Sequence, residues 1–247
     1  MPDITEPRWS VVIPAYNEAQ RLPAYLGEVV AYFDGRGEPY EVIVVDDGSA
    51  DETAARVLEA QAIHRAVTLH RLAQNRGKGF AVRAGMRAAR GGLRLMADAD
   101  GATPIAEVKR LETAMEAGAD VAVGSRALPD PSVRREVQIH RKVSGEIFNF
   151  LARRMGVGDV SDTQCGFKLF RGAVAETLFR ELETDGFGFD VELLMLARRR
   201  GYRVTEVAIN WADQPGSKVD VLRDGPRMLA QILRARVRLA RRGRRRP

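Results

Sequence analysis

The chain has very little cysteine, with Cys165 as the only one among 247 residues. A lone thiol excludes an internal disulfide, and such usage is typical of a reducing compartment. The sequence also lacks any run of roughly 18 apolar residues that could cross a bilayer. The first nine residues carry two acids and no apolar core, so they do not predict a signal peptide. We therefore expect a cytoplasmic protein, soluble or peripheral on a membrane.

The net positive charge is confined to one segment. The formal net charge is +6, but residues 223–247 hold ten arginines against Asp224, which gives this segment +9 and leaves residues 1–222 at −3. This division predicts a catalytic domain over 1–222 and a basic C-terminal helix and tail over 223–247. We expect no nucleic-acid partner, because residues 1–222 are nearly neutral and show no interleaved aromatics.

Apolar residues in the tail recur on one face of a helix, namely Met228, Leu229, Ile232, Leu233 and Val237. A basic amphipathic helix suits an anionic membrane surface, which would place the protein on the inner face of the membrane. In the alternative, this apolar face packs on the body and only the arginines beyond residue 240 are free.

Apolar runs alternate with helical patterns along the first half of the chain. Strands are expected at 10–13, 42–45, 67–69, 93–96 and 121–123, and helices over 22–33, 51–63, 78–89 and after Pro104. Ser49 with Glu52 three residues later reads as a capping box for the second helix. Further on, helices are expected near 136–155 and 191–200, and a strand at 204–209. The order predicts an α/β fold with a mostly parallel sheet covered on both faces.

Two aspartates end one of the expected strands. Asp98 and Asp100 follow the run 93–96, and because residues i and i+2 point the same way they present hard oxygen donors that suit Mg²⁺ or Mn²⁺ with a diphosphate. The polar turns 14–18 and 46–49 end two other strands and would meet the aspartates at the edge where α/β sheets bind ligands. Segment 75–80 lacks P-loop spacing and is expected to line the same crevice. Together these turns predict a nucleotide site.

These motifs resemble those of inverting family 2 glycosyltransferases with the GT-A fold, over nearly the whole chain. The resemblance lies in Val12-Ile13-Pro14-Ala15-Tyr16-Asn17-Glu18, Val44-Val45-Asp46-Asp47-Gly48-Ser49 and Asp98-Ala99-Asp100. Within that family, segments 75–79, 123–126, 162–168 and 215–218 look like the dolichyl-phosphate and polyprenyl-phosphate sugar synthases, and segments 98–103 and 164–168 look more like the glucosyl branch. Mannosyl relatives carry an amide side chain where this chain has Ala102, so a metal ligand from that position is absent.

The resemblance implies a GT-A fold and a nucleotide-sugar donor, with UDP-glucose favoured over GDP-mannose. Asp98 and Asp100 are the implied metal ligands. The donor-binding residues expected from the crevice and from the resemblance are Pro14, Ala15, Tyr16, Asn17, Glu18, Val45, Asp47, Lys78, Gly79, Asp98, Ala99 and Asp100.

Transfer from a nucleotide sugar builds negative charge on the leaving diphosphate. A divalent ion at Asp98 and Asp100 would stabilise that charge, and Lys218 and Arg126 are the other expected catalytic residues. The sequence therefore predicts a site whose main contribution is positive charge.

The acceptor decides whether a general base is needed. A phosphate monoester is mostly dianionic at neutral pH and can attack without one, and we expect Arg126, Arg141 and Ser144 to anchor it. A hydroxyl acceptor would need a base, for which Asp190 and Glu192 are the candidates.

We expect a metal-dependent inverting glycosyltransferase that moves glucose from UDP-glucose to a polyprenyl phosphate. The alternatives are a family member with a hydroxyl acceptor and one that uses GDP-mannose. A nucleotidyltransferase is disfavoured, because it would show a glycine-rich loop with Arg and Lys directly after the first strand, and residues 14–18 contain none.

Overall fold

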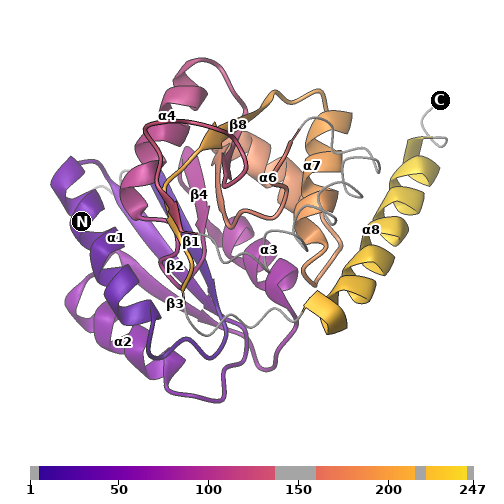
Figure 1. Ribbon diagram of the computed structural model, residues 1–247. Helices are drawn as coiled ribbons and strands as arrows, with labels where there is room; N and C mark the ends of the chain where they lie inside the picture. The colour runs from indigo at the N-terminus through magenta and orange to yellow at the C-terminus, as the bar shows by residue number, and fades with distance from the viewer. Residues whose placement is uncertain (1–5, 137–159, 215–220, 244–247) are drawn as a thin grey trace.

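The computed structural model describes residues 6–136, 160–214 and 221–243, and it contains a seven-stranded mixed sheet in the order β3-β2-β1-β4-β7-β5-β8 (Figure 1). The strands are β1 (Trp9–Ala15), β2 (Tyr40–Asp46), β3 (Val67–Arg71), β4 (Leu93–Ala97), β5 (Val121–Ser125), β7 (Phe167–Arg171) and β8 (Val204–Ala208). Only β7 runs antiparallel to its neighbours β4 and β5, so the expected mostly parallel sheet is confirmed.

Helices cover both faces of the sheet. They are α1 (Leu22–Arg36), α2 (Thr53–Ile63), α3 (Lys78–Ala88), α4 (Val108–Glu116) after the 3₁₀ turn η1 (Ile105–Glu107), α6 (Gly172–Glu181), α7 (Phe189–Arg199) and α8 (Val221–Gly243). Successive residues of β1 show the layering, since Val11 packs in the core cluster of α1, α2 and α4, and Val12 packs in that of α3, α6 and α7. A strand buried on both faces carries a continuous apolar run, which is why these strands could be recognised in the sequence.

Two expectations about local structure are wrong, one at Glu136 and one at Ser49. The helix near 136–155 does not begin at Glu136, because Arg135–Glu136 forms the short strand β6, which pairs with β9 (Trp211–Ala212); residues 137–155 lie outside the described residues. The capping box also fails. Ser49 Oγ instead accepts a hydrogen bond from the Asn17 backbone N–H, and α2 begins at Thr53, whose N–H donates to Asp51.

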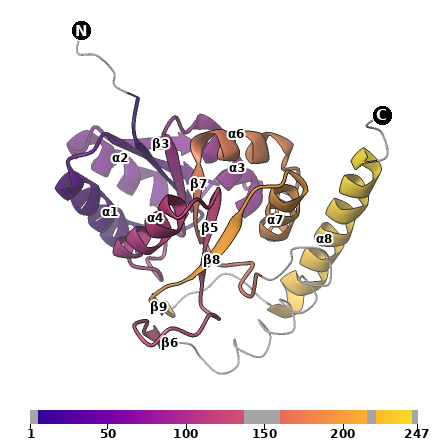
Figure 2. The ribbon, with the colours of Figure 1, turned by 90° about the horizontal axis from the view of Figure 1, so that it is seen from above.

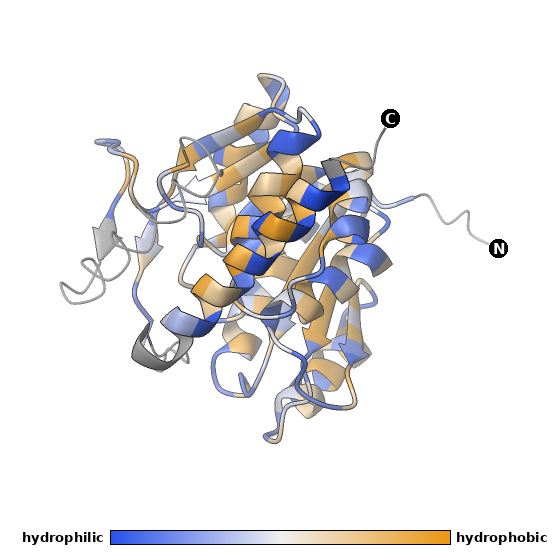
Figure 3. Ribbon diagram, turned by 90° about the vertical axis from the view of Figure 1, so that its right-hand side faces the viewer, coloured by the Kyte–Doolittle hydropathy of each residue, from blue (hydrophilic) through white to orange (hydrophobic). Residues whose placement is uncertain are grey.

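Helix α8 packs on the outer side of α7, at the opposite end of the molecule from α1 and α2 (Figures 1 and 2). Its inner face buries Met228, Ile232, Ala235 and Leu239, and Ile232 joins the core cluster of α7. The expected apolar stripe is thereby divided. Its other edge stays in solvent, with Leu233 49% and Val237 50% exposed, and Figure 3 shows apolar and hydrophilic residues alternating along α8. None of the helices among the described residues is both long and apolar enough to cross a membrane.

Candidate functional site

The turns after β1 and β2 are fastened to one another at the carboxyl edge of the sheet. Asn17, in the left-handed region at φ 53°, donates its N–H to Ser49 Oγ at 2.8 Å and accepts from the Ala50 N–H at 2.9 Å. The Glu18 N–H donates to Thr53 Oγ1 at 2.7 Å. Tyr16 stands in the same turn and is 39% exposed. These hydrogen bonds join the turn 14–18 to the turn 46–49 and the start of α2, so that the two turns form one wall of the site.

Asp47 anchors the segment 75–80, which precedes and begins α3. Its two carboxylate oxygens accept from the backbone N–H groups of Arg76 and Gly77 at 2.7 and 2.8 Å. Burial raises the pKa of Asp47, and the two N–H donors offset part of that rise. Asp47, expected from the sequence to bind a ligand, thus also anchors the 75–80 segment.

Lys78, the first residue of α3, reaches the aspartate turn. Its Nζ lies 2.7 Å from Asp98 Oδ1, and both side chains are only partly exposed. Although burial alone would lower it, the charge of Asp98 raises the pKa of Lys78. The structure thus brings Lys78 of segment 75–80 against Asp98, one of the two expected metal ligands.

The two aspartates after β4 sit among charged neighbours. Asp100 Oδ1 accepts from the Ala102 N–H at 3.1 Å, and its Oδ2 lies 4.0 Å from an Arg21 guanidinium nitrogen. Arg21 is itself paired with Glu18 at 2.6 Å. Burial, followed by the nearby charge of Asp98, raises the pKa of Asp100, which is the electrostatic setting that attracts a cation.

The donor set fits a hard divalent ion shared with a ligand. No group of three or more His, Cys, Asp or Glu residues able to hold a metal occurs in the described parts of the chain. Asp98 and Asp100, with side chains 35% and 29% exposed, can supply two carboxylates. Mg²⁺ and Mn²⁺ accept such partial protein coordination and fill the rest with phosphate oxygens and water.

Arg126, just past β5, is held in a bidentate ion pair. Its Nε and a terminal nitrogen donate to Asp162 at 2.7 and 2.8 Å, and its guanidinium lies 5.4 Å from the Trp211 ring centroid. Although burial alone would raise it, Arg126 holds the pKa of Asp162 below its ordinary value. The guanidinium is therefore fixed in direction and still one-third exposed.

Buried ion pairs engage both base candidates. Lys168 Nζ donates to Asp190 at 2.5 Å and to the Cys165 carbonyl at 2.6 Å. Glu192, 1% exposed, accepts from the Thr184 N–H and from Arg238, both at 2.8 Å. Both carboxylates are buried in these contacts, and the charge of Asp190 also acts on Lys78.

Arg21 was not expected at the site from the sequence, and Asp162 and Lys168 were singled out only as parts of the segment 162–168, without a role of their own. A lysine inside the apolar run 167–170 is a signal for an ion pair, because a buried lysine needs a buried acid elsewhere. Three expected site residues, Lys218, Arg141 and Ser144, lie outside the described residues.

Comparison with known proteins adds a family. The sequence model of the protein family described as glycosyl transferase family 2 matches residues 10–179. Curated dolichyl-phosphate beta-glucosyltransferases are similar over most of the chain. The Drosophila melanogaster protein is 43% identical over 85% of this chain and 68% of its own length, the human protein 38% over 85% and 69%, and the Saccharomyces cerevisiae protein 35% over 91% and 72%.

Solved structures show the same fold at lower identity. Glucosyl-3-phosphoglycerate synthase from Mycobacterium tuberculosis, in complex with Mn²⁺, UDP and glucosyl-3-phosphoglycerate, matches with a TM-score of 0.70 at 19% identity, over 93% of this chain and 80% of that one. Mannosyl-3-phosphoglycerate synthase from Rubrobacter xylanophilus matches with a TM-score of 0.70 at 19% identity, over 97% and 75%.

Proposed function

The chain belongs to glycosyl transferase family 2, and we propose that it transfers glucose, with inversion, from UDP-glucose to a polyprenyl phosphate such as dolichyl phosphate. The observation that carries this proposal is the similarity, at 35–43% identity, to relatives named for that reaction. The carboxyl edge supports it, because Asp47, Lys78, Asp98 and Asp100 lie together there.

The donor's nucleoside is assigned to the wall formed by the first two turns. Pro14, Tyr16, Glu18 and Val45 would contact it together with Asp47, whose carboxylate keeps lone pairs beyond the two that the 76–77 N–H groups use. Exposure of Tyr16 at this edge supports stacking on a base, since an aromatic side chain in solvent offers its face to a flat ligand. Ala15, Asn17, Ala99 and Gly79 complete the proposed surface as close backbone neighbours.

Asp98 and Asp100 are proposed to hold Mg²⁺ or Mn²⁺. When bound, the ion neutralises the charge that grows on the leaving diphosphate. Lys78 would add positive charge for the same group, and a charge already in place costs no reorganisation during the reaction. Lys218, outside the described residues, is proposed to contribute a second cation.

The ion pairs of Asp190 and Glu192 support a phosphate acceptor, which needs no general base. Asp190 is tied to Lys168 and Glu192 to Arg238, so both acids hold cations in place. A dianionic phosphate needs no base, and Arg126 is a fixed, partly exposed cation that suits it. Arg141 and Ser144 remain proposed anchors of the same phosphate.

The outer edge of α8 is the proposed membrane contact. Leu233 and Val237 are exposed there, and Arg241 follows at the C-terminal end of the helix. An apolar edge beside arginines suits an anionic leaflet, and a lipid-linked acceptor requires the enzyme to reach that surface. We place the protein on the cytoplasmic, inner face.

The test is direct transfer with a labelled donor. Purified protein with Mn²⁺, UDP-[¹⁴C]glucose and a short, water-soluble prenyl phosphate should give a labelled, acid-labile prenyl phosphate glucose of β configuration. Parallel reactions replace the donor with GDP-mannose and the acceptor with the matching prenol. Transfer of mannose, or of glucose to the prenol, would establish one of the two alternatives instead.

A further inference from the structure

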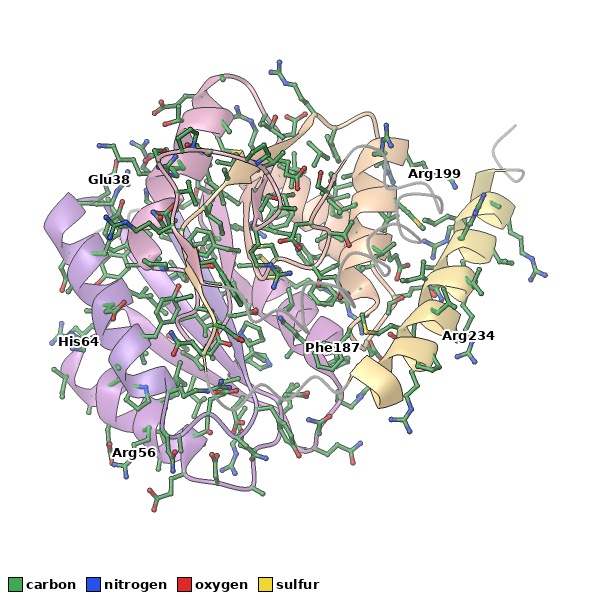
Figure 4. The ribbon with its side chains drawn as sticks, viewed as in Figure 1. Glu38, Arg56, His64, Phe187, Arg199 and Arg234 are labelled. Carbon is green, nitrogen blue, oxygen red and sulfur yellow. The ribbon has the colours of Figure 1, made fainter. Side chains whose placement is uncertain are left out.

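Polar side chains of helix α8 contact the loop 183–188. Arg238 lies 3.2 Å from the Glu183 carboxylate and donates to Glu192 at 2.8 Å. About two turns earlier, Gln231 Oε1 accepts from the Gly188 N–H at 3.0 Å. The loop is therefore attached at both ends to a helix that lies far from the sheet, and Figure 4 shows Phe187 of this loop close to α8.

The same loop lies directly against the start of α3. The Asp185 carbonyl accepts from the Phe80 N–H at 3.0 Å, and the Asp185 carboxylate accepts from Arg83 at 2.6 Å. A Cβ at Gly77 would lie 2.6 Å from the Asp185 carbonyl oxygen, and one at Gly79 would overlap the Thr184 carbonyl oxygen. There is no room between the loop and the turn that carries Lys78.

Glu192 connects these two contacts. One of its oxygens accepts from Arg238, and the other accepts from the Thr184 N–H at 2.8 Å, whose own carbonyl faces Gly79. Glu192 is 1% exposed, so its charge depends on Arg238, and removing one partner of a buried pair leaves the other uncompensated.

We propose that Glu192 and Arg238 are positioning residues for the donor site, which hold the loop 183–188 against the 77–80 turn and thereby keep Lys78 on Asp98. The 77–80 turn is then held by two contacts. Asp47 accepts from the Gly77 N–H, and α8 acts through Arg238, Glu192 and the loop 183–188. Neither residue touches the substrate in this assignment. The inference rests on the proposed function, because it assumes that UDP-glucose binds at this edge.

The experiment compares Arg238→Met with a matched change on the same helix, Arg234→Met. Arg234 is exposed and lies on the side of α8 that faces away from α7 (Figure 4). The parent and both variants are assayed without membranes, with Mn²⁺, UDP-glucose and a short soluble prenyl phosphate. Arg238→Met should raise the KM for UDP-glucose about tenfold and leave the KM for the acceptor within about twofold. A general loss of folded protein would instead lower kcat and move neither KM.

Two further variants test the route of the effect. Arg238→Lys keeps a donor for Glu192 and should recover most of the donor affinity. In a Lys78→Met background, Arg238→Met should add less than about a twofold change, because residues that act through one another are not additive. If Arg238→Met does not fold by circular dichroism, Glu192→Gln carries the test with the same expected split of the two KM values.

The outcomes separate this inference from the proposed function. A parent protein that neither binds UDP-glucose in calorimetry nor transfers glucose overturns both. A parent that does so, with an unchanged donor KM in folded Arg238→Met, overturns the positioning role alone. A full tenfold effect of Arg238→Met in the Lys78→Met background also overturns it, since Arg238 would then act by another route.

Discussion

Replacing Gly166 with alanine should inactivate the protein while leaving its fold in place. Gly166 precedes β7, and a Cβ at this position would overlap all three carboxyl atoms of Asp98. The carboxylate must therefore turn away from Lys78, to which it is now paired at 2.7 Å, and one of the two proposed metal ligands is displaced. We expect turnover to fall at least about a hundredfold, which corresponds to roughly 2.7 kcal/mol of transition-state stabilisation.

The loss of stability should be small by comparison. Overpacking a closed core costs about 1–3 kcal/mol, but the Asp98 side chain is 35% exposed and can swing toward solvent, so we expect about 1 kcal/mol, or a fall in Tm of roughly 2–4 °C. Gly27→Ala is the matched control. It lies within α1 with nothing inside 4 Å of its new Cβ, so activity should be unchanged and Tm equal or higher. Glucosyl transfer and differential scanning fluorimetry measure both quantities, and Gly166→Ala with turnover within about tenfold of the parent at saturating Mn²⁺ would refute the reasoning.

Three other changes test the remaining assignments. Asp100→Asn should nearly abolish transfer with little change in Tm, because an amide cannot replace the anionic ligand; turnover within about tenfold of the parent at saturating metal would contradict the metal site. Asp47→Ala should weaken UDP binding measured by calorimetry, since it removes a nucleoside contact and the anchor of the 76–77 N–H groups; an unchanged Kd would place the base elsewhere. Deleting residues 241–247 should sharply reduce sedimentation with anionic vesicles at low salt, as added salt should in the parent, while transfer to a soluble prenyl phosphate survives; equal sedimentation of both forms would disprove the membrane role.

The sequence was informative wherever a local pattern determined the structure. Parallel strands buried on both faces carry apolar runs, and their carboxyl ends meet at one edge, so the positions of Asp47, Asp98 and Asp100 followed from order alone. Strand β7 was missed, because it enters the sheet from far along the chain and its fully buried Lys168 interrupts the apolar run. The charge of that lysine is paired with Asp190, and such pairing across 22 residues leaves no local signature.

Two local patterns could not be interpreted from the sequence alone, because the same side chains can contact more than one neighbour. The pattern of Ser49 and Glu52 is that of a capping box, yet α2 begins only at Thr53, and the Ser49 hydroxyl accepts from the Asn17 N–H of the neighbouring turn. The apolar stripe of α8 is similarly ambiguous, since the same periodicity serves protein on one edge and solvent or lipid on the other. In both cases the choice depends on a neighbour supplied by the tertiary fold.

The ion pairs around the carboxyl edge explain how one site can hold many charges before a substrate binds. Lys78 is paired with Asp98, Arg126 with Asp162 and Lys168 with Asp190. Each carboxylate holds its cation in a fixed direction, and the fully buried Lys168 could not keep its charge without one. A divalent ion that binds Asp98 competes with Lys78 for that carboxylate, and a donor that brings its own diphosphate offers Lys78 a new anion. The metal ion takes Asp98 from Lys78, and the donor diphosphate gives Lys78 a new anion. The donor in turn draws Lys78 from Asp98, and the metal ion gives Asp98 a new cation. Metal and donor should therefore each bind more tightly when the other is present.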